Sequence, residues 1–131
     1  MTVSVNTEGK GVMSIAVTGA AGTAIGGVAN PEGVDILILR STWKITTAST
    51  GAATVNIGVG AAVNTDATDI INALAANGAV TGWYNGQVMQ NGAKTAITAP
   101  AVWSADKFVT FTGSAATTGL VATLYLEYIR A

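Results

Sequence analysis

Val34-Asp35-Ile36-Leu37-Ile38-Leu39-Arg40-Ser41-Thr42-Trp43-Lys44-Ile45-Thr46-Thr47 and, shortly after it, Thr54-Val55-Asn56-Ile57-Gly58-Val59-Gly60 are the two stretches that decide the fold. β-Branched residues dominate both stretches, as they do in strands. Between them, Ser49-Thr50-Gly51 supplies turn-forming residues. We therefore predict two strands joined by a tight turn, which is a hairpin over residues 34–60.

The two predicted strands differ in how many of their faces are apolar. In the second strand, Val55, Ile57 and Val59 alternate with small or polar residues, which predicts one buried face. In the first strand, an apolar face runs along odd positions, namely Leu37, Leu39, Trp43 and Ile45. The even positions of its first half are apolar too: Val34, Ile36 and Ile38.

A strand that is apolar on both faces needs a second covering layer. In a chain of 131 residues that layer is a remote segment or another subunit. Fully extended, residues 34–47 would span about 46 Å, which is longer than an ordinary strand. We therefore also predict a bend near Ser41.

The length and composition limit the possible functions. The 131 residues predict a single domain with one core. The chain has no Cys and no His, which excludes disulfides and thiolate metal sites and removes the commonest general base. Charged residues make up 10% of the chain, against about 25% in typical soluble domains, so we expect an assembly to cover much of its surface. Its six scattered basic residues make no basic patch, so we predict no nucleic-acid binding.

The first third of the chain is rich in Gly and Ala and has no charged residue from Gly11 to Ala29. A membrane helix and a secretory signal both fit poorly, because bulky Leu or Phe are missing and Glu8 lies where a signal would be positive. Alternating Met13, Ile15 and Val17 predict a short strand, followed by a flexible loop.

We interpret residues 1–33 as an extended Gly/Ala-rich arm and residues 34–131 as the sandwich, within a single domain. The arm is the candidate cover for Val34, Ile36 and Ile38, on the same subunit or a neighbour. Deletion of residues 1–30 is then expected to leave the sandwich folded.

Residues 64–78 hold the one candidate helix, with an irregular loop as the alternative. Asn64, Thr65 or Asp66 could cap this helix, and Asn77-Gly78 could end it. Ile70, Ile71 and Leu74 would share one side. Asp66 and Asp69 raise the possibility of calcium, but two acids without a ligand loop favour a role at the helix start instead.

Turn signals divide the rest of the chain into further strands. The pairs Asn77-Gly78, Asn85-Gly86 and Asn91-Gly92 favour type I′ turns and predict a short meander over residues 80–84, 87–90 and 93–98. Residues 107–113 and 120–130 flank a Ser/Ala/Thr/Gly segment and predict a closing hairpin. We expect one face of the last strand in the core: Leu120, Ala122, Leu124, Leu126 and Tyr128.

Many strands with turns at short intervals indicate an all-β fold, a β-sandwich or jelly-roll with at most one short helix. No catalytic constellation is found, because Ser has no activating base and nothing in the sequence locates a glycosidase pair among the seven scattered carboxylates. We therefore predict no enzymatic activity and no cofactor or metal.

Aromatic residues offer the one candidate ligand platform. Trp43, Trp83, Tyr84 and Trp103 could stack on a sugar ring. Trp43 lies on the predicted core face, so we expect it to be buried. Trp83 and Tyr84 are adjacent in a predicted strand, so one of the two should point outward. That residue could be an interface anchor, and an ordinary core role is the alternative.

The segment 45–59, the Asn/Thr/Asp-rich connection after it, and Gly119-Leu120-Val121-Ala122-Thr123-Leu124-Tyr125-Leu126-Glu127-Tyr128-Ile129 resemble the decoration or cement proteins of tailed bacteriophages. The resemblance covers about residues 34–130. It implies a β-sandwich or jelly-roll on the outer surface of the virion head, forming a homotrimer at threefold positions and bridging major capsid protein subunits. Such proteins have no catalytic residues to carry over.

The resemblance and the residue pattern together define a candidate interface. It consists of Met13, Ile15, Val17, Ile25, Val34, Ile36, Ile38, Trp83 and Tyr84. We expect contacts with the major capsid protein and with other copies of this chain, and none with nucleic acid or a membrane. Two alternatives remain open: a glycan- or host-surface-binding module of a head fibre, and a self-assembling tail-tube or coat-type subunit.

Overall fold

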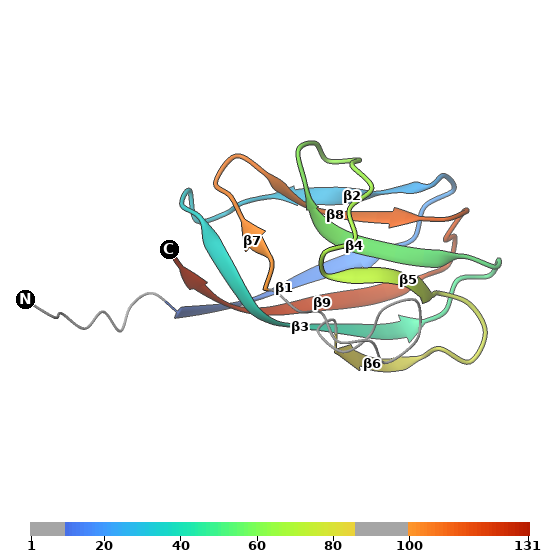
Figure 1. The fold of residues 1–131 in the computed structure, drawn as a ribbon. Helices are drawn as coiled ribbons and strands as arrows, with labels where there is room; N and C mark the ends of the chain where they lie inside the picture. Colours follow the sequence, from blue (N-terminus) through green and yellow to red (C-terminus); the bar gives the residue numbers. More distant parts are fainter. Residues whose placement is uncertain (1–9, 86–99) are drawn as a thin grey trace, which may run out of the picture.

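The computed structural model describes residues 10–85 and 100–131, which form two antiparallel sheets packed face to face (Figure 1). The first sheet has the order β1 (Lys10–Thr18), β9 (Val121–Arg130), β3 (Ile36–Thr47) and β6 (Gly82–Asn85), and β7 (Val102–Trp103) also pairs with β3. The second sheet has the order β2 (Ala24–Ala29), β8 (Phe108–Gly113), β4 (Thr54–Gly60) and β5 (Ile71–Ala75). The all-β sandwich is therefore confirmed, and the described residues contain no helix.

Strand pairing is nested along the chain. β1 pairs with β9, β2 with β8, β3 with β7 and β6, and β4 with β5. Two further pairings, β9 with β3 and β8 with β4, complete the sheets. Apart from β4–β5 and β6–β7, consecutive strands lie in opposite sheets.

The core lies between the two sheets and contains large side chains from both. Trp43 of β3 stacks on Phe111 of β8, with ring centroids 6.0 Å apart and an interplanar angle of 27°. The buried face of β9 is the predicted one, since these residues are all buried: Leu120, Ala122, Leu124, Leu126 and Tyr128. Trp43 is fully buried as expected, and so is Trp103.

A β-bulge in β3 changes which of its positions face the core. Ile38 is opposite Tyr128 and Arg40 is opposite Glu127, so Leu39 is an extra residue in the ladder. The core positions are therefore Ile36 and Ile38 before the bulge, and Ser41, Trp43 and Ile45 after it. The predicted continuous odd face is wrong for Leu37 and Leu39, and the bulge lies close to the bend predicted near Ser41.

Both predicted hairpins are wrong in their pairing, although their strands exist. β3 and β4 lie in opposite sheets, and so do β8 and β9. The turn backbone bonds to remote segments instead: Ser49 N donates to Ala76 O at 2.7 Å, and Thr117 N donates to Ala20 O at 2.8 Å. These connections therefore cross from one sheet to the other.

The predicted arm is wrong for residues 10–29, because they form β1 and β2 within the sandwich. The short strand around Met13, Ile15 and Val17 is confirmed, and the flexible loop after it is partly replaced by β2. Val17 is buried in the core, and Ile15 and Val28 pack against it. Deletion of residues 1–30 would remove one strand from each sheet, so it cannot serve as a test of an independent arm.

The predicted helix over residues 64–78 is wrong, because this segment contains the strand β5. The helix-like spacing of its apolar residues has another cause. Val55 is opposite Leu74 and Ile57 is opposite Ile71, so β5 has one more residue than β4 between these pairs. Ala73 takes up this extra residue with a positive φ of 53°. The bulge turns Ile71 and Leu74 to the same core, which imitates a helical spacing of three. Of the predicted meander, β6 is described, and residues 87–90 and 93–98 lie outside the described residues.

The bulge in β5 leads to a stability prediction. Ala73→Gly should leave the free energy of unfolding unchanged or raise it by up to about 1 kcal/mol, because Gly adopts a positive φ without a Cβ clash. Ala75→Gly in the same strand is the matched control and should lower it by about 0.5–1 kcal/mol. Urea unfolding of both variants measures this, and equal destabilisation would contradict the assigned bulge.

Candidate binding surfaces

The acidic residues of the 61–70 connection have structural roles. Asp66 Oδ1 accepts hydrogen bonds from Asn56 Nδ2 and Thr112 Oγ1, both at 2.8 Å. Asp69 Oδ1 accepts one from Val59 N at 2.7 Å. The bonds from Asn56 and Thr112, in that order, lower the pKa of Asp66. These carboxylates fasten the connection to the second sheet.

Two searches for special sites among residues 10–85 and 100–131 give negative results. No group of three or more Asp, Glu, Cys or His side chains in this part of the chain is placed to hold a metal ion. The same residues include no helix long and apolar enough to cross a membrane.

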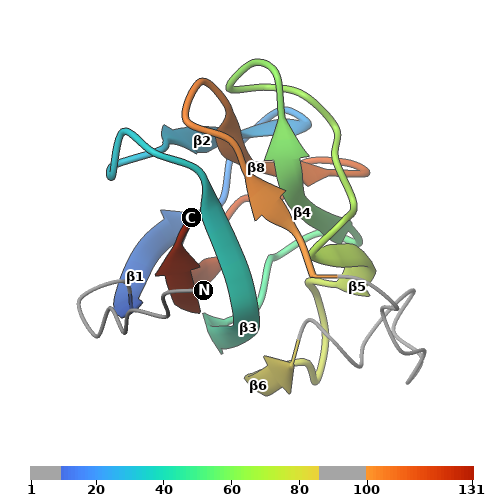
Figure 2. The same cartoon turned by 60° about the vertical axis from the view of Figure 1, so that its left-hand side comes forward.

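One side of the sandwich is open, and we call it the open side. It comprises β1, β2 and the groove between them, and both strands run along this side in Figure 2. Among the described residues, β1 pairs with β9 alone and β2 with β8 alone, so each is the edge strand of its sheet. The groove has a volume of about 230 Å³, and its lining includes Ile15, Val17, Ile25 and Val28. Its side-chain lining is therefore largely apolar, although polar atoms are exposed in it as well, and it lies beside two strand edges.

The structure brings part of the predicted interface together at the open side. Ile15, Val17 and Ile25 line the groove, and Met13 lies on β1 and packs against the core. Val34 is exposed on the connection before β3.

Ile36 and Ile38 are a correction to the predicted interface. Both are buried in the core of this chain, so they offer no surface to a partner. The covering layer that they required is the second sheet, and not an N-terminal arm.

A second surface lies on the outer face of the first sheet, and we call it the aromatic platform. It consists of Trp83 of β6, Lys44 of β3 and Tyr125 of β9. Trp83 is 63% exposed, whereas Tyr84 packs against the core and its hydroxyl donates to Val80 O at 2.6 Å. The prediction that one of this aromatic pair points outward is therefore confirmed.

Sequence reasoning missed two members of the aromatic platform. Lys44 and Tyr125 come from strands that are far from Trp83 in the sequence, and the strand register brings them to it. In the sequence, both residues lie on the polar faces of predicted strands. This position indicates that they point outward, but it does not indicate which residues of other strands lie beside them.

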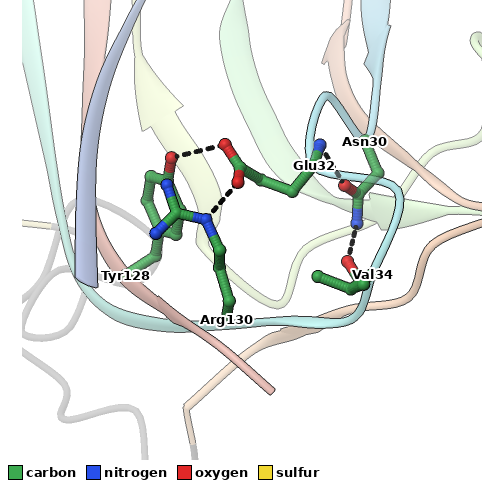
Figure 3. A network of polar contacts seen from close by, with 5 residues as sticks. All are labelled: Asn30, Glu32, Val34, Tyr128 and Arg130. Atoms are coloured by element: carbon green, nitrogen blue, oxygen red, sulfur yellow. Dashed lines mark hydrogen bonds and ion pairs between the residues drawn. The ribbon is translucent and has the colours of Figure 1, made fainter. Parts of the chain in front are cut away.

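A polar network attaches the connection before β3 to the end of β9 (Figure 3). Glu32 accepts hydrogen bonds from Arg130 Nε and from the Tyr128 hydroxyl, the latter at 3.0 Å. Asn30 Nδ2 donates to Val34 O at 2.8 Å and to Trp103 O at 3.0 Å. The bond from Arg130, ahead of the one from Tyr128, lowers the pKa of Glu32 even though desolvation opposes it.

No family model matches the chain, and searches of curated proteins and of solved structures find no match. Function therefore has to be argued from the open side and the aromatic platform themselves. Neither surface has the features of a catalytic centre, and both have features of binding surfaces.

The Glu32 network leads to a pH prediction. The pKa of Glu32 is lower in the folded protein than the ordinary glutamate value of 4.5. The network therefore stabilises the protein at pH values above 4.5, and this stabilisation is lost as the pH falls through the folded pKa. The melting temperature of Glu32→Gln should therefore lie below that of the wild type at neutral pH, and the difference should shrink in acid.

Thermal unfolding followed by circular dichroism between neutral pH and pH 3 measures this difference. Glu127→Gln is the control. Glu127 pairs with Arg40 at 3.7 Å on the exposed surface, so its substitution should lower the melting temperature less than Glu32→Gln does. A difference between wild type and Glu32→Gln that is independent of pH would contradict the role of this carboxylate.

Proposed function

We propose that this protein is a structural virion protein, which decorates a phage head from outside and stabilises it by bridging major capsid protein subunits. It acts as a homotrimer. The observation that carries the proposal is the open side, where an apolar groove lies between two edge strands. Support also comes from the low charge of the chain, at 10% of residues.

The edge of β1 lacks the usual protection against pairing with another chain. Edge strands of monomeric proteins are commonly blunted by charges, Pro or bulges. From Gly11 to Thr18, β1 has no charged residue and no Pro, and its register with β9 runs without a shift. Such an edge is suited to adding a strand or loop of a partner, with backbone hydrogen bonds for affinity and the groove for specificity.

The strand order supports the jelly-roll form of the sandwich, which we propose as the finer description of the fold. A jelly-roll is an antiparallel ribbon rolled up so that its outer strands come together. The nested pairs β1–β9, β2–β8, β3–β6 and β4–β5 agree with such a ribbon. β7 is an addition to this pattern, beside β3.

We propose a homotrimer because the resemblance to decoration proteins implies it, and the open side can supply its contact. If the open side meets a different patch on a neighbour, the contact is heterologous. A heterologous contact closes into a ring when its rotation allows, and three copies give the symmetry of a threefold position on a capsid. Copies in such a ring would cover each other's apolar grooves.

The assembly test uses a charged residue at the open side. Ala16 is an exposed residue of β1 in the groove lining, so Ala16→Glu should leave the fold intact. Burial of its unpaired carboxylate at an interface should weaken head binding by at least about tenfold and shift the trimer to monomer. Val102→Glu, on β7 at the other edge of the first sheet, is the matched control and should behave as wild type.

Size-exclusion chromatography with light scattering, alone and with phage heads that lack this protein, measures both effects. Circular dichroism establishes that each variant is folded. A wild-type monomer that leaves heads undecorated would refute the proposal. Rings or tubes formed by the protein alone would favour the tail-tube or coat-type alternative.

A further inference from the structure

We infer that the aromatic platform is a saccharide-binding site, in which the exposed ring of Trp83 stacks on a pyranose. This site goes beyond the proposed capsid contact, since it lies on the outer face of the first sheet and not at the open side. It would take a polysaccharide or the glycan of a cell surface.

The indole of Trp83 is held in place from one side. Lys44 is directly opposite Trp83 in the ladder of β3 and β6, and its Nζ lies 4.7 Å from the centre of the ring. The ring of Tyr125 lies beyond, with centroids 5.9 Å apart and a tilt of 30°. These contacts orient the indole and leave 63% of the residue exposed. A side chain that is already ordered loses little entropy when a ligand stacks on it.

Hydroxyl groups surround the aromatic platform. Thr123 is opposite Lys44, and Thr42 is opposite Tyr125. One strand further, Ser14 of β1 is opposite Tyr125. Thr42 and Thr123 alternate with buried neighbours, and Ser14 alternates with partly buried ones that pack against the core. All three are partly or fully exposed, so their side chains lie on the outer face of the sheet.

A pyranose matches this arrangement of groups. One face of the ring presents C–H groups, which carry partial positive charge and are attracted to the negative face of an indole. Its rim carries hydroxyls, which can pair with Thr hydroxyls and with the ammonium of Lys44. Among the described residues these groups lie along an exposed sheet face, which suits a chain of sugar units better than a single small ligand.

Two other classes of ligand fit less well. A nucleic acid would need several cations near the aromatic ring, and on this face Arg40 already lies 3.7 Å from Glu127. A protein partner would anchor on Trp83 if apolar neighbours excluded water around it. Here Tyr125 is one neighbour, but Lys44 and, further out, hydroxyl-bearing Thr residues keep the surroundings polar. The surroundings therefore favour a ligand that is apolar on one face and polar at its rim.

The chain offers an internal reporter for this site. It has three Trp, and Trp43 and Trp103 are fully buried in the core. Acrylamide should therefore quench the emission of Trp83 almost selectively. A bound sugar should protect that emission, whereas ligands that bind elsewhere should not change it.

A printed array of bacterial and plant polysaccharides, probed with the wild-type protein, gives candidate ligands. Fluorescence titration with the best of them should then show protection of Trp83 from acrylamide. Trp83→Ala should weaken binding at least about tenfold, and Trp83→Phe should retain part of it because a ring remains. Ala24→Glu should bind the sugar as wild type does, because Ala24 is an exposed residue of β2 in the second sheet.

Three outcomes would overturn the saccharide site. These are an array without any bound polysaccharide, binding that persists unchanged in Trp83→Ala, and protection of Trp83 by phage heads but not by sugars. The melting temperature of Trp83→Ala establishes that the variant is folded, and its head binding separates this inference from the proposed capsid contact. Loss of sugar binding with normal head binding is the expected pattern.

Discussion

The sandwich depends on one constraint, which is that β3 turns Ile36 and Ile38, and after its bulge Trp43 and Ile45, toward the second sheet. Without a bulge, either Ile36 and Ile38 or Trp43 and Ile45 would face solvent, because strand residues alternate. Burial of one large apolar side chain contributes about 1.5–3 kcal/mol. A lost ladder hydrogen bond costs about 1 kcal/mol. The bulge at Leu39 therefore costs less free energy, through the lost ladder bond, than the burial of two further core side chains contributes. It keeps one core continuous along the twelve-residue strand.

The same constraint explains which parts of the fold could be read from the sequence. Strand positions and the buried face of β9 follow from local alternation, which needs no knowledge of partners. Bulges are harder to find, because an extra residue disturbs the very alternation that is being read. Ile71 and Leu74 show this, since the bulge at Ala73 gives them the spacing of a helix.

Which strands pair with each other could not be predicted from local sequence patterns, for a different reason. A turn segment predicts that the chain reverses, but not whether it returns in the same sheet or crosses to the other one. The answer depends on which groups form hydrogen bonds with the backbone of the turn. Here Thr50 N donates to Thr118 O, and Ser114 N donates to Thr54 O. The two turns are thus bonded to each other across 60 and 68 residues of sequence, and each depends on the nested pairing being complete. Of the candidate site, the apolar segment of β1 and β2 could be found from its missing charges, whereas the partners of Trp83 required the strand register.

The positions of the two surfaces make the proposed functions compatible. β1 is the edge at the open side, and β9 and β3 separate it from β6, which carries Trp83. Neighbouring strands are about 4.8 Å apart, so roughly 14 Å of sheet lies between the edge and Trp83 itself. A partner that adds a strand to β1 extends the sheet in its own plane and leaves the outer face uncovered. The same subunit can therefore be fixed to a shell through its edge while its exposed indole stays in contact with solvent and with sugars.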